Sequence, residues 1–166
     1  MTMFKIVPIT LALVAALAVP AVGNAKAAGK ARGMTCAPVS VAGVESQFKI
    51  FNDAWATKNP DTVTALFTKD AVLLATVSNK PRTDHAGIRD YFVSFLKPSP
   101  IGTINTSTVK LDCNRAARVG TWTVSLADAQ GVRTDVKARY SFIYKYENGA
   151  WKIAHLHSSK MPEPTT

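Results

Sequence analysis

The feature that most constrains this fold is a pair of alternating aromatic and polar segments near the C-terminus, residues 137–146 and 151–160, separated by Asn148-Gly149. Asn-Gly supplies the two positive-φ positions of a type I′ turn, so the stretch predicts a β-hairpin. A two-residue turn also sets the register of the two strands. The predicted facing pairs are Tyr146 with Trp151, Tyr144 with Ile153, Phe142 with His155, and Tyr140 with His157.

Side chains alternate along a strand, so these four pairs are expected to share one face of the hairpin. That face is aromatic and carries two histidines, and we expect it to face a core or a pocket. The opposite face is expected to be available to solvent or to another subunit. It is predicted to carry Arg139, Ile143, Lys145 and Leu156.

The rest of the chain predicts helices first and strands afterwards. Apolar residues recur at helical spacing in 41–58, after a predicted cap at Ser40. Asn59-Pro60 begins a short second helix, and Thr83 or Asp84 caps a third over 85–97. Strands are predicted over residues 70–77, 104–112, 117–127, 132–146 and 151–160. This order predicts an α+β domain with its helices on one face of an antiparallel sheet.

The N-terminal segment has the pattern of a secretory signal peptide. Lys5 precedes an apolar run over 6–22, and small residues then offer cleavage sites. An uncleaved membrane anchor is the alternative, but the run is short and contains Pro8 and Pro20. We predict a signal peptide over 1–27, a flexible lead-in over 28–39, one domain over 40–163 and a tail over 164–166. The mature protein is expected to be periplasmic or secreted, without membrane attachment.

The charges of the chain are scattered and predict no nucleic-acid partner. The formal net charge is +9, and removal of residues 1–27 takes away Lys5 and Lys26 and no acid, which leaves +7. Nucleic-acid binding proteins gather such charges in a patch or a recognised motif, which this sequence lacks. A basic exported protein is the simpler interpretation.

The chain has two cysteines, Cys36 and Cys113. Export places them in an oxidising compartment, which favours a disulfide between them over two free thiols. Neither cysteine has a partner at metal-ligand spacing.

Five groups of residues carry a resemblance to a known family: Phe51-Asn-Asp-Ala-Trp55, Leu66-Phe67 with Asp70-Ala71-Val72, the segment 77–82, the segment 88–92, and Asn148-Gly-Ala-Trp151 leading to His155-Leu-His157-Ser-Ser and Met161-Pro162. Together they resemble the nuclear transport factor 2-like superfamily, also called SnoaL-like. Within it, the chain is similar to the association (hub) domain of calcium/calmodulin-dependent protein kinase II and its bacterial stand-alone relatives.

The resemblance implies a cone-shaped, cystatin-like fold in which a curved sheet wraps a long N-terminal helix around a pocket. It also implies a homo-oligomer, a dimer or a larger ring, formed through the sheet. Kinase activity is not expected, because the motifs that bind ATP and Mg²⁺ are missing. One departure concerns Ser158, which stands where the hub domain has an arginine, so recognition of a carboxylate by that arginine cannot be carried over.

The candidate pocket residues come from the first helix, the loop before the third helix and the hairpin. They are Trp55, Arg82, Tyr140, Phe142, His155 and His157. Either histidine could act as a general base beside Tyr140. A metal centre is not expected, since a catalytic metal takes a third ligand and the one other histidine is His85. No cofactor is expected.

These observations favour an exported, non-catalytic domain that oligomerises and binds a small polar or aromatic ligand. One alternative is a small cofactor-independent enzyme (an isomerase, lyase or hydrolase) that uses a pocket histidine and tyrosine. The other is a pure assembly module.

Overall fold

A computed structural model describes residues 35–162, so the predicted signal peptide and the tail over 164–166 lie outside the described residues. The order of elements agrees with the sequence. They are α1 (Val41–Ala56), α2 (Pro60–Thr64), β1 (Phe67–Leu74), α3 (His85–Phe95), β2 (Ile101–Asp112), β3 (Arg115–Ala127), β4 (Arg133–Glu147) and β5 (Ala150–Lys160). The largest difference in bounds is at β1, which lies three residues before the predicted 70–77.

The three helices begin where the sequence predicts. The side chains of Ser40, Asn59 and Asp84 each accept a hydrogen bond from a backbone N–H of the first turn, at 3.0, 2.8 and 2.7 Å. These bonds satisfy donors that have no partner within a helix. Asp84, rather than Thr83, is therefore the cap of α3. None of the helices in residues 35–162 is long and apolar enough to cross a membrane.

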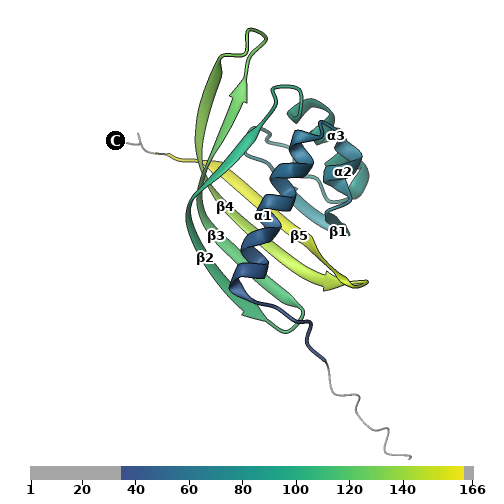
Figure 1. Ribbon diagram of the computed structural model, residues 1–166. Coiled ribbons are helices and arrows are strands. Elements are labelled where there is room, and N and C mark those ends of the chain that lie inside the picture. The colour runs from purple at the N-terminus through teal and green to yellow at the C-terminus, as the bar shows by residue number, and fades with distance from the viewer. Residues whose placement is uncertain (1–34, 163–166) are drawn as a thin grey trace, which may run out of the picture. The chain divides into compact units, whose positions relative to one another are not determined.

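The strands form one mixed sheet in the order β1-β5-β4-β3-β2. β2 to β5 are antiparallel neighbours, as predicted, but β1 pairs in parallel with β5. The expectation of a purely antiparallel sheet was therefore wrong at this edge. Figure 1 shows α1 lying along the concave side of the sheet, with α2 and α3 beside it.

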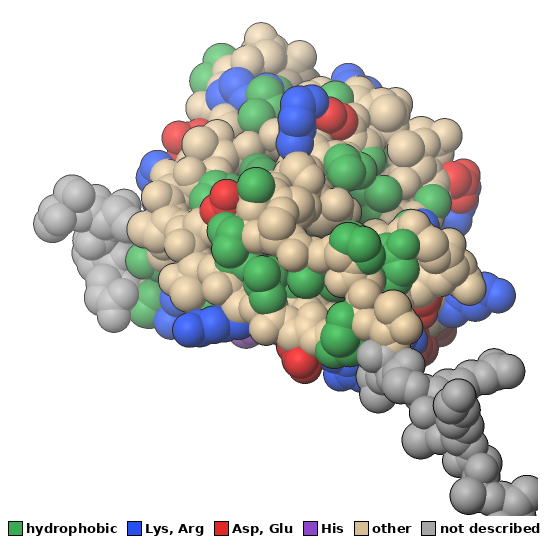
Figure 2. Space-filling model, turned by 60° about the horizontal axis from the view of Figure 1, so that its bottom comes forward, with side chains coloured by type: hydrophobic (Ala, Val, Ile, Leu, Met, Phe, Trp, Pro, Cys, Tyr) green, Lys and Arg blue, Asp and Glu red, His purple; other side chains and the backbone are tan. Residues whose placement is uncertain are grey.

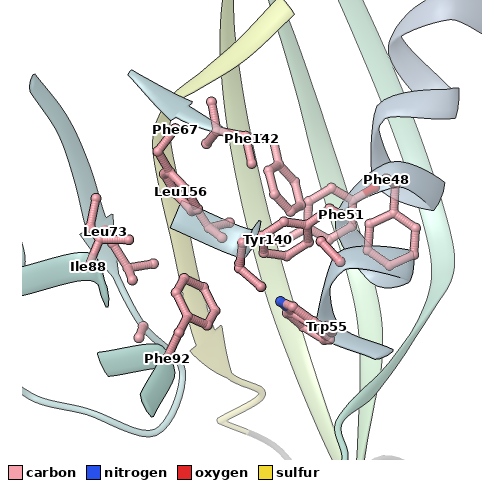
Figure 3. Packing of buried hydrophobic residues seen from close by; sticks show 14 of the residues in the cluster. Phe48, Phe51, Trp55, Phe67, Leu73, Ile88, Phe92, Tyr140, Phe142 and Leu156 are labelled. Atoms are coloured by element: carbon pink, nitrogen blue, oxygen red, sulfur yellow. The ribbon is translucent and has the colours of Figure 1, made fainter. Parts of the chain in front are cut away.

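The core lies between α1 and the concave face of the sheet. Phe51 of α1 is completely buried, and its ring lies 5.4 Å from that of Phe142 on β4. Phe48 lies one helical turn earlier and contacts Trp122 of β3 edge-on at 6.0 Å. Figure 3 shows the rings of Phe48, Phe51 and Phe142 gathered with Trp55, Phe92 and Leu156. Burial of such aromatic side chains is the main source of stability available to this fold.

The β4–β5 hairpin confirms the predicted turn and the first part of the predicted register. Asn148 and Gly149 have φ angles of 52° and 81°, as a type I′ turn requires. Tyr146 lies opposite Trp151, and Tyr144 lies opposite Ile153.

Beyond Ile153 the predicted register was wrong, because β5 contains a β-bulge. Ile143 lies opposite His155, so Ala154 is an extra residue without a partner on β4. An extra residue reverses which side chains face inward from that point on. The later pairs are Phe142 with Leu156, Ser141 with His157, and Tyr140 with Ser158.

The bulge exchanges the two faces of β5 relative to the prediction. Leu156 and Ser158 face inward and are 3% and 6% exposed. His155 and His157 lie on the convex face of the sheet, and His157 is exposed. They share that face with Arg139, from which the prediction had separated them.

The predicted disulfide between Cys36 and Cys113 is present. It ties the segment before α1 to the turn between β2 and β3. The backbone N–H of Ala37 also donates to the side chain of Asn114 in that turn, at 2.7 Å. The two interactions hold the start of the domain against the far end of a long hairpin.

Figure 2 shows one face of the molecule, on which Lys and Arg side chains are spread between apolar patches and do not gather in a single basic area. The scattered charges of the sequence are therefore also scattered in space on this face.

Candidate functional site

A hollow lies between α1, α3 and the concave face of the sheet, and we refer to it as the inner hollow. The empty space within it amounts to about 290 Å³, including the part open to solvent at its mouth. It has room for about one water molecule as it stands. The inner hollow is lined by Phe51, Trp55, Leu73, Ala75, Thr76, Tyr91, Phe92, Phe95, Trp122, Val124, Leu156 and Ser158.

Ser158 is the centre of the polar contacts in the inner hollow. Its hydroxyl oxygen accepts a hydrogen bond from Nε1 of Trp122 at 3.0 Å. The same hydroxyl is hydrogen-bonded to the hydroxyl of Thr76, which follows β1. The bulge in β5 is what brings Ser158 to this position, since the unbroken alternation would have placed a histidine here.

Trp55 faces Ser158 and Trp122 from the helix side of the inner hollow. Its ring lies 4.8 Å from Phe51, 5.1 Å from Phe95 and 5.9 Å from Trp122. Its Nε1 is buried and has no hydrogen-bond partner. Figure 3 shows this nitrogen directed toward the middle of the aromatic cluster. An indole N–H can only donate, so its partner must be an acceptor in the hollow, such as a water molecule or a ligand oxygen.

A second and larger cavity, which we call the vestibule, adjoins the inner hollow and shares Tyr91 and Phe95 with it. Its empty space amounts to about 670 Å³. The rings of Tyr91 and Phe95 are stacked at 5.1 Å and belong to both cavities. The vestibule is lined by Val77, Ser78, Arg82, Asp90, Tyr91, Ser94, Phe95, Pro98 and Leu126.

Arg82 lies in the wall of the vestibule and is held by its own loop. Its guanidinium lies over the ring of Tyr91 at 5.1 Å, a cation–π arrangement. Nη1 donates to the hydroxyl of Ser78 and to the carbonyl of Lys80. Burial raises the pKa of Tyr91 well above its usual value, while the charge of Arg82 acts in the opposite direction. Tyr91 therefore stays protonated at any physiological pH.

Of the predicted pocket residues, Trp55 lines the inner hollow and Arg82 lines the vestibule. Tyr140 and Phe142 belong to the core beside the inner hollow and do not line it. The hydroxyl of Tyr140 donates to the backbone carbonyl of Thr106 at 3.0 Å. Phe142 is completely buried and its ring stacks on Tyr144 at 5.7 Å.

The two predicted catalytic histidines lie outside the inner hollow, on the convex face. Burial and the neighbouring His157 together lower the pKa of His155. His157 lines an open groove with Leu74, Asn79 and Lys160, across the end of β5. Neither histidine lies opposite Tyr140, so the expected His–Tyr pair is not formed.

Acidic side chains and metal-ligand groups are also missing from the inner hollow. No carboxylate is among its lining residues, and Asp90 belongs to the vestibule. Arg89 forms an exposed ion pair with Asp61, with Nε 2.6 Å from the carboxylate. Within residues 35–162, no group of three metal-ligating side chains lies close enough to hold an ion.

Tyr91, Phe95 and Thr76 line these cavities without having been predicted from the sequence, and the buried Arg118 was not predicted either. Arg118 is 6% exposed on the concave face, where Nη1 donates to the carbonyl of Glu45 at 3.0 Å. The alternation in β3 was the available signal, because Arg118 shares its face with Trp122. The roles of Tyr91 and Phe95 depend on how α3 packs against the sheet, for which the sequence offers no comparable signal.

Residues 42–162 match the model described as the calcium/calmodulin dependent protein kinase II association domain. A solved structure from Xanthomonas campestris, described as the same kind of domain, is 41% identical. The similarity covers 79% of this chain and 98% of that one, with a TM-score of 0.72. None of the curated proteins matches the sequence.

More distant structures share the fold alone. A protein from Novosphingobium aromaticivorans described as an aromatic ring hydroxylase is 23% identical, with a TM-score of 0.63 over 72% of this chain and 87% of that one. A protein from Streptomyces avermitilis described as a dehydratase of the NTF2-like family is 10% identical, with a TM-score of 0.64 over 72% of this chain and 95% of that one. The predicted α+β, nuclear transport factor 2-like fold is confirmed.

Proposed function

Because the chain belongs to the calcium/calmodulin dependent protein kinase II association domain family, we propose that it is an exported, non-catalytic domain that self-associates and binds a small ligand. The ligand is a polar or aromatic molecule that lies in the vestibule and reaches into the inner hollow. The domain has no kinase activity.

The observation that carries the binding proposal is the unpartnered Nε1 of Trp55 in an aromatic cavity. Buried polar groups in proteins nearly always have a partner, and a partnerless one calls for an explanation. A ligand acceptor supplies that explanation. A few placed polar groups among apolar walls, here Trp55, Thr76 and Ser158, are also typical of small-molecule sites.

The enzyme alternative finds less support than the binding proposal. A general base must lie within hydrogen-bond reach of the proton that it removes. His155 and His157 lie on the convex face, and the hydroxyl of Tyr140 already donates to Thr106. The relatives described as a hydroxylase and a dehydratase share only the fold, which does not determine chemistry.

Self-association is proposed to use the convex face of the sheet. Members of the matched family are described as association domains. The middle of this face carries small and β-branched side chains, including Ala117, Val119 and Ile143, with the two histidines beside them. Val119 is 38% exposed, as a residue covered only in an assembly would be.

Export is supported by the disulfide between Cys36 and Cys113, because such bonds persist in oxidising compartments. It agrees with the predicted signal peptide over 1–27, and with a periplasmic or secreted mature protein.

Calorimetric titration with phenol, a small polar aromatic probe, tests the binding proposal. We expect saturable binding of one phenol per chain. Ala75 lines the inner hollow, so Ala75→Phe should fill the space and abolish binding, whereas Ala86→Phe on the exposed side of α3 should bind as the wild type does. Unsaturable heats in the wild type, or equal binding by the wild type and Ala75→Phe, would contradict the proposal.

A further inference from the structure

Two indole N–H groups line the inner hollow from opposite walls, and only one has a partner. Trp122 on β3 donates to Ser158, while Trp55 on α1 donates to nothing. Trp55 is 2% exposed, so its N–H is largely removed from bulk water. Leaving a buried donor unsatisfied costs free energy, and an acceptor atom placed beside it recovers that cost. The first requirement on a ligand is therefore a hydrogen-bond acceptor.

The second requirement is neutrality. No Lys, Arg, Asp or Glu is among the residues that line the inner hollow. The hydroxyls of Ser158 and Thr76 are bonded to each other, and Ser158 also accepts from Trp122. An anion moved into this space would lose its hydration with a single free N–H in return, which is a large net cost. Arg82 lies in the vestibule together with Asp90, outside the hollow.

The third requirement is a flat apolar body. The inner hollow has room for about one water molecule, so the acceptor atom can enter it while the bulk of the ligand cannot. The adjoining vestibule has a cavity volume of about 330 Å³, at the lower end of the usual range for ligand pockets. Tyr91 and Phe95 line both spaces, so a planar ligand held there would contact aromatic side chains.

From these three requirements we infer that the ligand is a neutral aromatic carbonyl compound, whose oxygen accepts a hydrogen bond from Trp55 Nε1 while its ring lies against Tyr91 and Phe95. The inference rests on the proposed binding function and makes it specific. Trp55 is then the residue that selects ligands with an oxygen acceptor over hydrocarbons of the same shape.

Three probes of similar shape separate these requirements. Acetophenone is neutral and carries a carbonyl oxygen, α-methylstyrene replaces that oxygen by a methylene group, and benzoate carries a charge. Their affinities are measured by calorimetry, and the indole N–H resonances of the three tryptophans are followed by ¹H–¹⁵N NMR. We expect acetophenone to bind about tenfold more tightly than α-methylstyrene, as one hydrogen bond would give. Benzoate should bind more weakly than acetophenone, and acetophenone should shift the Trp55 resonance downfield.

Two matched variants assign the effect to a single donor. Trp55→Phe keeps an aromatic ring and removes the N–H, so acetophenone and α-methylstyrene should bind to this variant with about equal affinity. Trp151→Phe makes the same change at a tryptophan that lies outside both cavities, and should keep the wild-type preference. If Trp55→Phe does not fold, the wild type still tests the inference: a downfield shift of the Trp55 resonance with acetophenone supports it, and an unmoved resonance contradicts it.

The possible failures are distinct. Equal binding of acetophenone and α-methylstyrene, with an unmoved Trp55 resonance, would overturn this inference and leave the binding proposal in place. Tighter binding of benzoate would overturn the neutrality requirement, and the inference with it. If none of the three probes binds and phenol gives no saturable heat either, the proposed function itself is wrong.

Discussion

At the scale of single residues, Trp55 and Trp122 carry the same chemical group in two different situations. The N–H of Trp122 donates to Ser158 and so contributes to the packing of the sheet. The N–H of Trp55 makes no such contribution and is kept buried at a cost. A ligand acceptor that pairs with the N–H of Trp55 would remove the free-energy cost of the unpaired donor. For this reason the binding proposal depends on Trp55 more than on any other side chain.

Histidine titration offers a test at the same scale. Burial first, and the charge of His157 second, lower the pKa of His155 from its ordinary value of 6.5. We predict that His157→Gln raises the pKa of His155 part of the way back, because the second cause disappears and burial remains. NMR titration of the imidazole C–H resonances measures this directly.

The same shift has a consequence for stability. Since the pKa of His155 is lower in the folded state, its contribution to stability is complete above the unfolded value of 6.5 and is lost as pH falls through the folded value. The free energy of unfolding should therefore decrease as the pH is lowered below 6.5.

A pKa of His155 that does not respond to His157→Gln would show that the two imidazoles are not close neighbours on the convex face.

At the scale of elements, the β4–β5 hairpin shows both the reach and the limit of sequence patterns. Asn148-Gly149 specifies a turn through local backbone angles, and the adjacent pairs follow from it. The bulge at Ala154 leaves no comparable local signature. It becomes understandable only from the packing, since it turns Leu156 into the core and the two histidines away from it.

The helices were predictable because their signals are local. Ser40, Asn59 and Asp84 cap them, and the spacing of apolar residues identifies the buried side of α1. The parallel pairing of β1 with β5 joins segments far apart in the chain, and neither segment alone specifies it. The candidate site depends on both the bulge and the placement of α3, so the sequence identified Trp55 but placed the histidines on the wrong face.

The disulfide provides a prediction about how the elements are held together. Cys36 and Cys113 are 77 residues apart, and the bond joins the lead-in to the β2–β3 turn. The chain-entropy model assigns a bond across such a loop about 4.5 kcal/mol, as an upper estimate. We predict that the double variant Cys36→Ala/Cys113→Ala loses up to that amount of its free energy of unfolding and therefore unfolds at a lower urea concentration. Reduction of the wild type should reproduce the loss, and an unchanged urea midpoint in both experiments would contradict the prediction.

At the scale of the whole molecule, the proposal assigns the two faces of the sheet to different tasks. The concave face packs on α1 and carries the inner hollow, whereas the convex face is proposed for self-association. The alternation within β3 illustrates the division, since Arg118 is buried against α1 while its neighbour Val119 is exposed on the other side. The same strands can therefore serve an assembly and a binding site without sharing side chains.

A charge placed on the convex face should separate the subunits. We predict that the wild type has the mass of a multiple of the chain by light scattering and that Val119→Arg has the mass of a single chain, because an arginine cannot be buried there without a partner. Val93→Arg is the matched control, since Val93 is 43% exposed on α3, away from the sheet. A wild type that remains a single chain at every concentration would contradict the proposed assembly.

The central claim is that a ligand binds at the inner hollow and the adjoining vestibule, and not on the face with the histidines. The most direct test is one NMR titration of the wild type with phenol, in which indole N–H and imidazole C–H resonances are recorded together. The proposal predicts that the resonances of Trp55 and Trp122 move in a saturable manner and that those of His155 and His157 move little. Saturable movement of the histidine resonances, with Trp55 and Trp122 unchanged, would contradict it.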